Sequence, residues 1–293
     1  MLKRKTLVFC MIFTLIIVAC DNQEAELVIT KNPQKAPQVP IENIDVADES
    51  KPLIQVSLED VVQICVRQDG APGMYIGDDG ELHGFYVDLD RLIMKEMGQA
   101  YHLKPYGDLG PVLQWLKTGE CHIALAAPDL PEYRSFLNLS NPYEILHFVT
   151  FVRKGNADIQ GDTKDEIIAS LHGKKVGVQT RGHIYQELRD IRQIELIEYP
   201  TTTRALADLS KGVLDAVPDV KRIGIYYSSL KSWDIVPVGQ PIISHKITTA
   251  FSKVYHQSII KRYNTALKTI QDNGQFDALY ESYFGPMGDE DRP

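Results

Sequence analysis

The chain has 293 residues, with 31 Lys plus Arg against 39 Asp plus Glu and a formal net charge of −8. Hydrophobic residues make up 44% and charged residues 24%, the composition of an ordinary globular protein. An acidic chain is a poor candidate for binding nucleic acid, and anionic lipid surfaces would repel it. We therefore expect no nucleic-acid partner, and any membrane attachment must have another cause.

The N-terminus has a basic start at 3–5 and an apolar run at 7–19. The run is too short for a comfortable membrane span and is typical of a secretory signal peptide, so residues 1–19 are expected to be removed. It ends in IVAC, which resembles the bacterial lipobox and implies a lipid on Cys20. The alternatives are an ordinary signal peptide with a chance cysteine, or an uncleaved anchor helix. Cleavage would leave 28 basic against 39 acidic residues, a net charge of −11.

Residues 20–56 contain four prolines and no lasting apolar periodicity, which favours a flexible tether behind the lipid. Asp21 follows the lipidated cysteine and resembles the signal for inner-membrane retention in Gram-negative cells. The predicted location is therefore the cell envelope, at the periplasmic face of the inner membrane if the cell is Gram-negative. Cys65 and Cys121 remain as an even pair, so either a disulfide or two buried free thiols is consistent with the sequence.

From about Leu58 the hydrophobic pattern alternates between the strand period and the helix period. Strands are predicted at 61–66, 122–128, 147–152, 174–180, 196–200, 214–220 and 246–252, and helices at 86–98, 111–120, 203–212, 258–274 and 275–285, with another beginning near Ile184. Such alternation indicates an α/β fold with parallel sheets covered by helices. About 230 residues is near the limit for one core, so we expect two lobes.

Five segments resemble, in order and spacing, the family 3 extracellular solute-binding proteins of bacterial import systems. They are DDGELHGFYVDLDRLIMKEMG (78–98), LKTGECHIALAAPDLPEYRSFLNLSNPYE (116–144), LHGKKVGVQT (171–180), ALADLSKGVLDAVPDV (205–220) and FDALYESYFG (276–285). The resemblance covers nearly the whole folded region and implies a type II-like periplasmic-binding-protein fold, with two lobes, two hinge crossings and ligand in the cleft between the lobes.

The resemblance places lobe 1 at 57–148 plus 250–288, lobe 2 at 153–245 and a short tail at 289–293. The two crossings would be the segments at 147–154 and near 245–251. Ligands of open α/β sheets bind at the carboxyl ends of strands, where loops and helix N-termini present N–H groups. A ligand that touches both lobes favours their closure.

Arg134 is the first predicted ligand contact, because the arginine at this motif position grips a ligand carboxylate in amino-acid-binding members of the family. A guanidinium fork matches a carboxylate with two parallel hydrogen bonds. The alternative is a solvated arginine, or one paired with Glu132 or Asp129. Asp219 would take the ligand's ammonium from the other lobe; alternatively, it caps the helix that begins near Lys221.

Asp129 departs from the family pattern, which has serine or threonine here. The sequence from Asp129 to Glu132 fits a helix capping box, and the acid could instead neutralise Arg134 or meet a cationic ligand group. In the first loop, at 67–77, the usual aromatic pair is replaced, leaving Gln68, Met74 and Tyr75 as candidate contacts.

In the lobe 2 turn, Thr180 and Arg181 stand at a helix N-terminus, where N–H groups suit an anion. His183 follows, and a lone histidine at such a turn is more often a polar surface residue than a ligand contact. Cys65 and Cys121 would lie on neighbouring strands of lobe 1. A similar cysteine pair recurs in a subgroup associated with periplasmic quinoprotein alcohol dehydrogenases.

The leading hypothesis is a non-enzymatic, monomeric, lipid-anchored binding protein that delivers an amino acid or related carboxylate to a membrane permease of the ATP-driven class. Nothing resembles a P-loop or a zinc site, so no cofactor or metal is expected. One alternative is a sensory or accessory lipoprotein serving a receptor or a periplasmic dehydrogenase. Another is an enzyme of the cyclohexadienyl dehydratase kind, in which Asp129 and Asp219 would be acid and base.

Overall fold

The computed structural model describes residues 53–107, 109–180 and 182–293. The predicted signal peptide, Cys20, most of the predicted tether and Arg181 lie outside the described residues. The chain divides into two units, residues 1–43 and 44–293, and the fold below is that of the second unit.

A seven-stranded sheet forms the backbone of the fold, with strand order β11-β8-β12-β6-β1-β5 and β7 paired to β12. Its strands are β1 (Val62–Arg67), β5 (Tyr101–Tyr106), β6 (Ile123–Pro128), β7 (Leu137–Leu139), β8 (Glu144–Arg153), β11 (Val217–Val220) and β12 (Ile235–Ser252). β1 runs parallel to β5 and β6, but β12 is antiparallel to both β6 and β8, and β8 is antiparallel to β11. The expectation of purely parallel sheets was therefore wrong, because the chain runs out along β8 and returns along β12.

We call lobe 1 the part built on β1, β5, β6 and β7, and lobe 2 the part built on β9, β10 and β11; β8 and β12 run through both. Lobe 1 carries α1 (Phe85–Met97), α2 (Leu109–Thr118), α3 (Pro131–Phe136), α8 (Ser258–Asp272) and α9 (Gln275–Phe284), with a small sheet of β2 (Asp69–Gly70), β3 (Met74–Ile76) and β4 (Leu82–His83). Lobe 2 carries α4 (Lys164–Ser170), α5 (His183–Leu188), α6 (Thr202–Ser210), α7 (Lys221–Lys231) and the parallel pair β9 (Lys175–Gln179) and β10 (Glu195–Tyr199).

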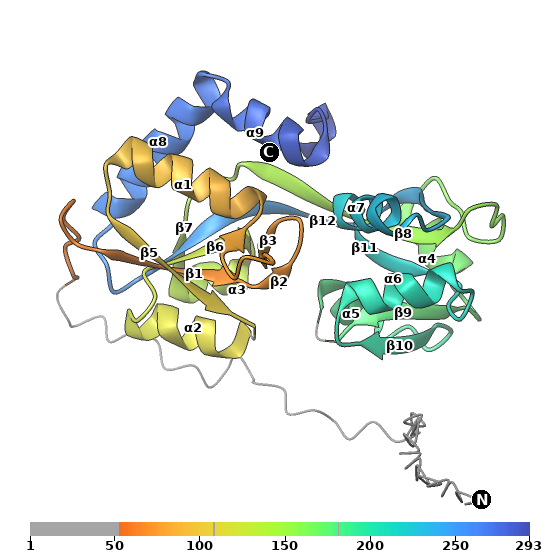
Figure 1. The fold of residues 1–293 in the computed structure, drawn as a ribbon. Helices are drawn as coiled ribbons and strands as arrows, with labels where there is room; N and C mark the ends of the chain where they lie inside the picture. Colours follow the sequence, from red (N-terminus) through yellow and green to blue (C-terminus); the bar gives the residue numbers. More distant parts are fainter. Residues whose placement is uncertain (1–52, 108, 181) are drawn as a thin grey trace, which may run out of the picture. The chain divides into compact units, whose positions relative to one another are not determined.

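Side chains of β1 alternate between two cores of lobe 1. Ile64 and Val66 face the core shared with α1, α8 and α9, whereas Cys65 faces the core shared with α2. Figure 1 shows α1 beside α8 and α9, which come from the opposite end of the sequence and close the same face of the sheet. Lobe 2 has two cores of its own, and Phe151 and Val152 of β8 point into different ones.

Helix α1 follows from its sequence. Leu89 and Ile93 recur at helical spacing and are buried, and Gly98 ends the helix in the left-handed conformation, with φ 62°. Asp90 is also buried; it accepts a hydrogen bond from the Tyr263 hydroxyl of α8 at 3.2 Å. A carboxyl group thus lies inside the main core of lobe 1.

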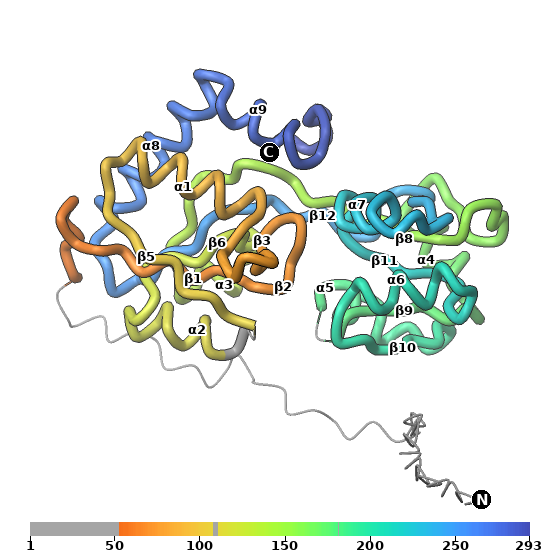
Figure 2. Tube along the Cα trace, viewed as in Figure 1, coloured from red at the N-terminus to blue at the C-terminus, as the bar shows by residue number. Residues whose placement is uncertain are grey.

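Most predicted elements are confirmed to within two residues, and the larger differences are informative. The strand predicted at 246–252 begins at Ile235: its first half contains Pro237, Gly239 and Pro241 and still pairs with β8, with a register irregularity between Val238 and Ile243. The strand predicted at 214–220 begins at Val217. The tube in Figure 2 follows β12 from lobe 2 into lobe 1 beside β6. The sequence prediction missed β5, the small sheet and α4.

Both ends of the second unit contradict the sequence reading. Residues 53–56 were assigned to the flexible tether, but Ile54 bridges to Tyr255 through backbone hydrogen bonds, and Val56 is buried in the lobe 1 core. The predicted tail includes a 3-10 helix, η2 (Asp289–Asp291), that contacts β8. Within the described residues, no helix has the length and apolar character needed to cross a membrane.

Candidate ligand-binding site

Arg67 ends β1 at the carboxyl edge of the parallel strands and was not selected from the sequence. Its Nε donates to Asp69 Oδ1 at 2.6 Å, and the side chain is 38% exposed. Burial by itself would lower the pKa of Arg67, but the hydrogen bond to Asp69 and the charges of Asp69 and Asp219 raise it. The two terminal amines of Arg67 make no contact within the described chain, so they are available to an anion. Its place at the end of the first strand is the signal that could have identified it.

Asp219 lies near the end of β11, in lobe 2. Its carboxylate accepts hydrogen bonds from the Thr202 hydroxyl and from the Val220 N–H, the latter at 2.6 Å. Burial raises the pKa of Asp219, against the opposing effects of these hydrogen bonds and of the Arg67 charge. The alternative role as a helix cap does not hold, because Val220 is the N-cap residue of α7 and no side chain caps it. A cationic group would find here a carboxylate that is costly to bury without a counter-charge.

Arg134 is paired within its own lobe. Its Nε and Nη2 donate to the two oxygens of Asp129 at 2.6 and 2.7 Å, a two-pronged contact. The guanidinium is 55% exposed, and the residue lines a surface pocket with Gln257 and Lys261 of α8. In the described part of the chain, no contact joins Arg134 to Asp219.

Asp129 is not the helix cap that the sequence pattern favoured. The N-cap residue of α3 is Leu130, whose hydrocarbon side chain accepts no hydrogen bond, and both oxygens of Asp129 accept from Arg134 instead. A charged partner outcompeted the local backbone N–H groups, since a charge-assisted bidentate contact is stronger than a single cap. The alternative hypothesis, that Asp129 neutralises Arg134, is confirmed.

The lobe 2 turn brings two histidines together. The ring centres of His183 and His245 lie 4.9 Å apart, and both rings contact Phe148 of β8 edge-on. Burial, together with the charge of His245, lowers the pKa of His183 to about 4, and burial also lowers the pKa of His245. Thr180 is exposed, and its hydroxyl donates to the Tyr199 carbonyl at 3.2 Å.

The first loop is held rigidly by the start of α1. The N–H groups of Phe85 and Tyr86 donate to the Pro72 and Gly73 carbonyls. Gly84 has φ 117°, and a Cβ there would lie 2.4 Å from the Gly73 oxygen, so only glycine fits this approach.

The three predicted contacts in this loop differ in exposure. Met74 is buried in the lobe 1 core, which gives it a packing role. Gln68 is exposed, and Tyr75 is half-buried with its ring 6.0 Å from that of His83.

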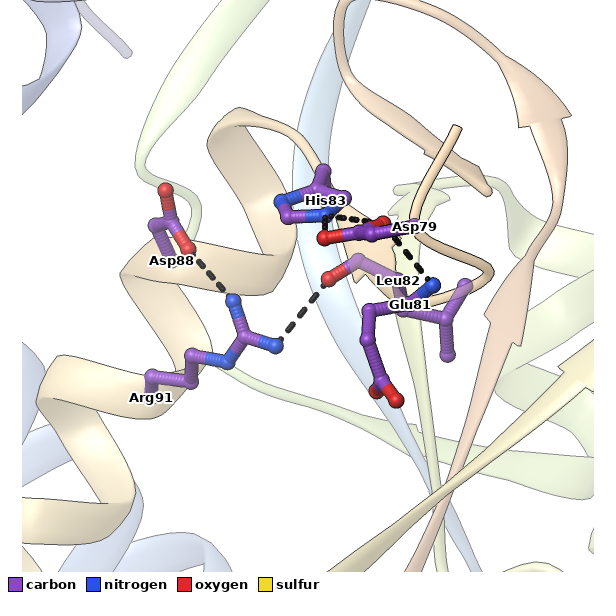
Figure 3. Close-up of polar contacts among 6 residues, drawn as sticks. All are labelled: Asp79, Glu81, Leu82, His83, Asp88 and Arg91. Carbon is purple, nitrogen blue, oxygen red and sulfur yellow. Dashed lines mark hydrogen bonds and ion pairs between the residues drawn. The ribbon is translucent and has the colours of Figure 1, made fainter. Parts of the chain in front are cut away.

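The far side of this loop is fixed by polar contacts shown in Figure 3. Asp79 accepts from the Glu81 N–H at 3.0 Å and contacts His83 Nε2 through both oxygens. Arg91 of α1 donates to Asp88 at 2.8 Å and to the Leu82 carbonyl at 3.0 Å. The β3–β4 turn is therefore tied to α1, and Tyr75 is held by a rigid support.

Cys65 and Cys121 form a disulfide, with their Cα atoms 6.1 Å apart. The bond joins the middle of β1 to the segment just before β6 and lies in the core beneath α2. It therefore stabilises the strands whose carboxyl ends carry Arg67 and Asp129. The described residues contain no cluster of three or more His, Cys, Asp or Glu side chains that could hold a metal ion.

The structure thus couples Arg67 electrostatically to Asp219 and leaves Arg134 with Asp129. Gln68 adjoins Arg67 in sequence, whereas Thr180 lies at the end of β9 in lobe 2. The arrangement presents one guanidinium and one carboxylate at strand ends of different lobes, which can bind a zwitterion and contains no activated nucleophile.

Two proteins similar to this chain are named for the amino acid that they bind. The L-cystine-binding protein TcyJ of Escherichia coli (strain K12) is 27% identical over 216 residues, 73% of this chain and 79% of that protein. An arginine-binding periplasmic protein of Mannheimia haemolytica is 26% identical over 216 residues, 71% of this chain and 84% of that protein.

Two solved structures share the fold. A histidine kinase sensor domain similar to periplasmic binding proteins has a TM-score of 0.67 at 21% identity, covering 80% of this chain and 98% of that one. The ancestral amino-acid-binding protein AncCDT-1, a precursor of cyclohexadienyl dehydratase, has a TM-score of 0.65 at 21% identity, covering 76% and 95%.

A family model for bacterial extracellular solute-binding proteins, family 3, matches residues 62–286. This range includes every described strand and helix except η2. The chain belongs to the family 3 bacterial extracellular solute-binding proteins.

Proposed function

We propose that this protein is a lipid-anchored binding protein that captures an amino acid or a related carboxylate for ATP-driven import. Family membership and the amino-acid-binding relatives support the ligand class and a permease partner. The observation that carries the proposal is that Arg67, at the end of β1, and Asp219, near the end of β11, carry opposite charges in different lobes. An α-amino acid has the complementary pair of charges.

In this proposal Arg67 receives the ligand's carboxylate and Asp219 its ammonium. Both arginines are paired with a carboxylate, but Asp69 takes only Nε of Arg67, whereas Asp129 takes both Nε and Nη2 of Arg134, so Arg67 is preferred. A ligand ammonium beside Asp219 would stabilise the ionised carboxylate and lower its pKa, and this gain exists only when the lobes close over the ligand. Thr180 and Tyr75 are proposed as further contacts on the two sides.

The lipid on Cys20 and the segment behind it would keep the binding domain near its membrane partner and so raise the local concentration of captured ligand. Attachment through acyl chains is consistent with an acidic protein, since the surface charge would not hold it to an anionic membrane. Mass spectrometry of the N-terminal peptide, with and without a change of Cys20 to Ser, tests this part of the proposal.

A thermal-shift screen of the purified chain against amino acids, polyamines and organic acids tests the ligand class. A ligand that binds only the native state raises the melting temperature, by an amount equivalent to about 2.7 kcal/mol at a hundredfold excess over Kd. Arg67→Met and Asp219→Asn should each remove the shift, whereas Arg204→Met, an exposed change on α6, should not. If Arg134→Met removes the shift and Arg67→Met does not, the carboxylate site is at Arg134 instead.

A sensory role is the second candidate, and the fold shared with a histidine kinase sensor domain favours it. In that case the same ligand would bind, but the partner would be a receptor. Co-purification of the chain from detergent-solubilised membranes separates the two, since a permease and its ATPase are expected for import and a kinase for sensing.

A further inference from the structure

Arg222, the second residue of α7 in lobe 2, is inserted into lobe 1. Its guanidinium donates to both oxygens of Glu144 at the start of β8, with Nη2 to Oε1 at 3.1 Å, and also to the Tyr86 hydroxyl of α1. The Arg222 side chain is 13% exposed and that of Glu144 is fully buried. Three hydrogen bonds therefore join one side chain of lobe 2 to two elements of lobe 1.

Four aromatic rings of lobe 1 surround the guanidinium. Its carbon lies 4.3 Å from the ring centre of Phe284, 5.3 Å from that of Tyr86, 5.8 Å from that of Phe85 and 5.9 Å from that of Tyr280. Such faces attract a cation and exclude water. Burial by itself would lower the pKa of Arg222, but the Glu144 carboxylate raises it above its usual range, so the ion pair is maintained.

The C-terminal segment adds contacts at the same place. His147 of β8 pairs through Nε2 with the Glu290 carbonyl oxygen at 2.8 Å and lies 3.8 Å from the Asp291 carboxylate. Lys221, the first residue of α7, lies 3.8 Å from the Glu290 carboxylate. Arg222 is thus tied to α1 of lobe 1 and to the start of β8, and Lys221 to the C-terminal segment that packs on β8.

We propose that Arg222 is the pivot of the hinge. The lobes would rotate about the point where Arg222 meets Glu144 and Tyr86, while the ends of β1 and β11 move relative to each other. The inference goes beyond the proposed function, since it rests on the two-lobed fold and not on the identity of the ligand.

The physical reason is the cost of separating the pair. Pulling Arg222 out of the ring of aromatic side chains would leave a fully buried Glu144 carboxylate without its counter-charge, which is strongly unfavourable. A motion of the lobes that keeps this contact therefore requires far less free energy than one that breaks it. Two connecting strands alone would permit twisting as well as closure, and the need to keep the Arg222 contact removes those motions that would break it.

Double electron–electron resonance between spin labels tests the pivot without any ligand. Labels on Gln114→Cys of α2 and Gln186→Cys of α5, both exposed, report the distance between the lobes. The full chain would carry Cys10→Ser and Cys20→Ser, with the disulfide retained. The chain with Arg222 should give one narrow distance distribution, and Arg222→Met should widen it about twofold, because more arrangements of the lobes become populated.

Arg91→Met is the matched control, because Arg91 also makes two contacts but both lie within lobe 1 (Figure 3). It should leave the distribution narrow. Arg222→Lys keeps the charge but cannot reach Glu144 and Tyr86 together, so it should also widen the distribution, and it decides the question if Arg222→Met fails to fold. An unchanged width in either folded Arg222 variant overturns the proposal.

Discussion

The carboxyl group of Asp90 offers a direct test of the packing of lobe 1. It is 1% exposed, Oδ1 accepts from Tyr263, and Oδ2 has no hydrogen-bond partner in the described structure. Burial raises the pKa of Asp90 from 3.8 to about 7, against the hydrogen bond from Tyr263, which lowers it. The perturbation we consider is Asp90→Asn, which keeps the size and the Tyr263 contact but removes the ionisation.

The sign follows from proton binding. Between pH 3.8 and about 7 the folded state keeps a proton on Asp90 that the unfolded state has released, so the free energy of unfolding falls as pH rises through this window. Raising the pKa of Asp90 by about 3 lowers the free energy of unfolding by about 4 kcal/mol above pH 8. About 3 kcal/mol of this loss occurs between pH 5 and pH 8.5. Relaxation of the core makes these values upper limits.

Urea unfolding of the native chain and of the Asp90→Asn variant, at pH 5 and at pH 8.5, measures the effect. The difference in the free energy of unfolding between the variant and the native chain should be larger at pH 8.5 than at pH 5, by up to about 3 kcal/mol in favour of the variant. Comparing the two proteins at each pH cancels the titration of all other groups. Glu96→Gln, an exposed carboxyl-to-amide change on the same helix, is the control. An equal effect of Asp90→Asn at both pH values would refute the reasoning.

Three further outcomes are expected. Replacing Cys65 and Cys121 by alanine removes a cross-link between residues 56 positions apart and should lower the free energy of unfolding, measured in urea, by about 2–4 kcal/mol. A reductant should destabilise the native chain but not this variant. Between pH 4 and 6.5, His183 binds fewer protons in the folded state than in the unfolded state, so acidification through this window should lower the free energy of unfolding by up to about 3 kcal/mol. In thermal unfolding, the melting temperature of His183→Gln should fall less between pH 7.5 and pH 4.5 than that of the native chain. An equal fall would contradict the assignment. Gly224→Ala places a Cβ 2.2 Å from the Phe151 ring and should lower stability by about 1–3 kcal/mol, whereas an unchanged melting temperature would show that α7 can shift freely.

Local patterns predicted β1 and α1 of lobe 1 correctly. The alternation in β1 sends Ile64 and Cys65 to opposite faces, and the helical spacing of Leu89 and Ile93 places α1 against the sheet. The order of the five family-like segments was enough to predict two lobes and the solute-binding family. These features lie within short stretches of chain, so hydrophobic periodicity and turn residues specify them.

The sequence misled where a local rule competed with a charge. Asp129 has the spacing of a helix cap, but Arg134 takes both of its oxygens, and only the folded geometry of α3 brings the guanidinium to them. The first half of β12 contains two prolines and a glycine, which weaken a strand prediction, yet it pairs with β8 because the neighbouring strand supplies the hydrogen bonds.

The sequence by itself therefore determined most of the element order and the family-level fold, whereas the export signal and the role of Asp219 stay predictions. Only the tertiary structure brought Arg67 into the electrostatic range of Asp219, and Arg222 into contact with Glu144 and Tyr86. The members of these groups are separated by 78 to 152 positions along the chain. No periodicity reaches that far, because such contacts depend on how sheets and helices pack and not on the preferences of any one segment.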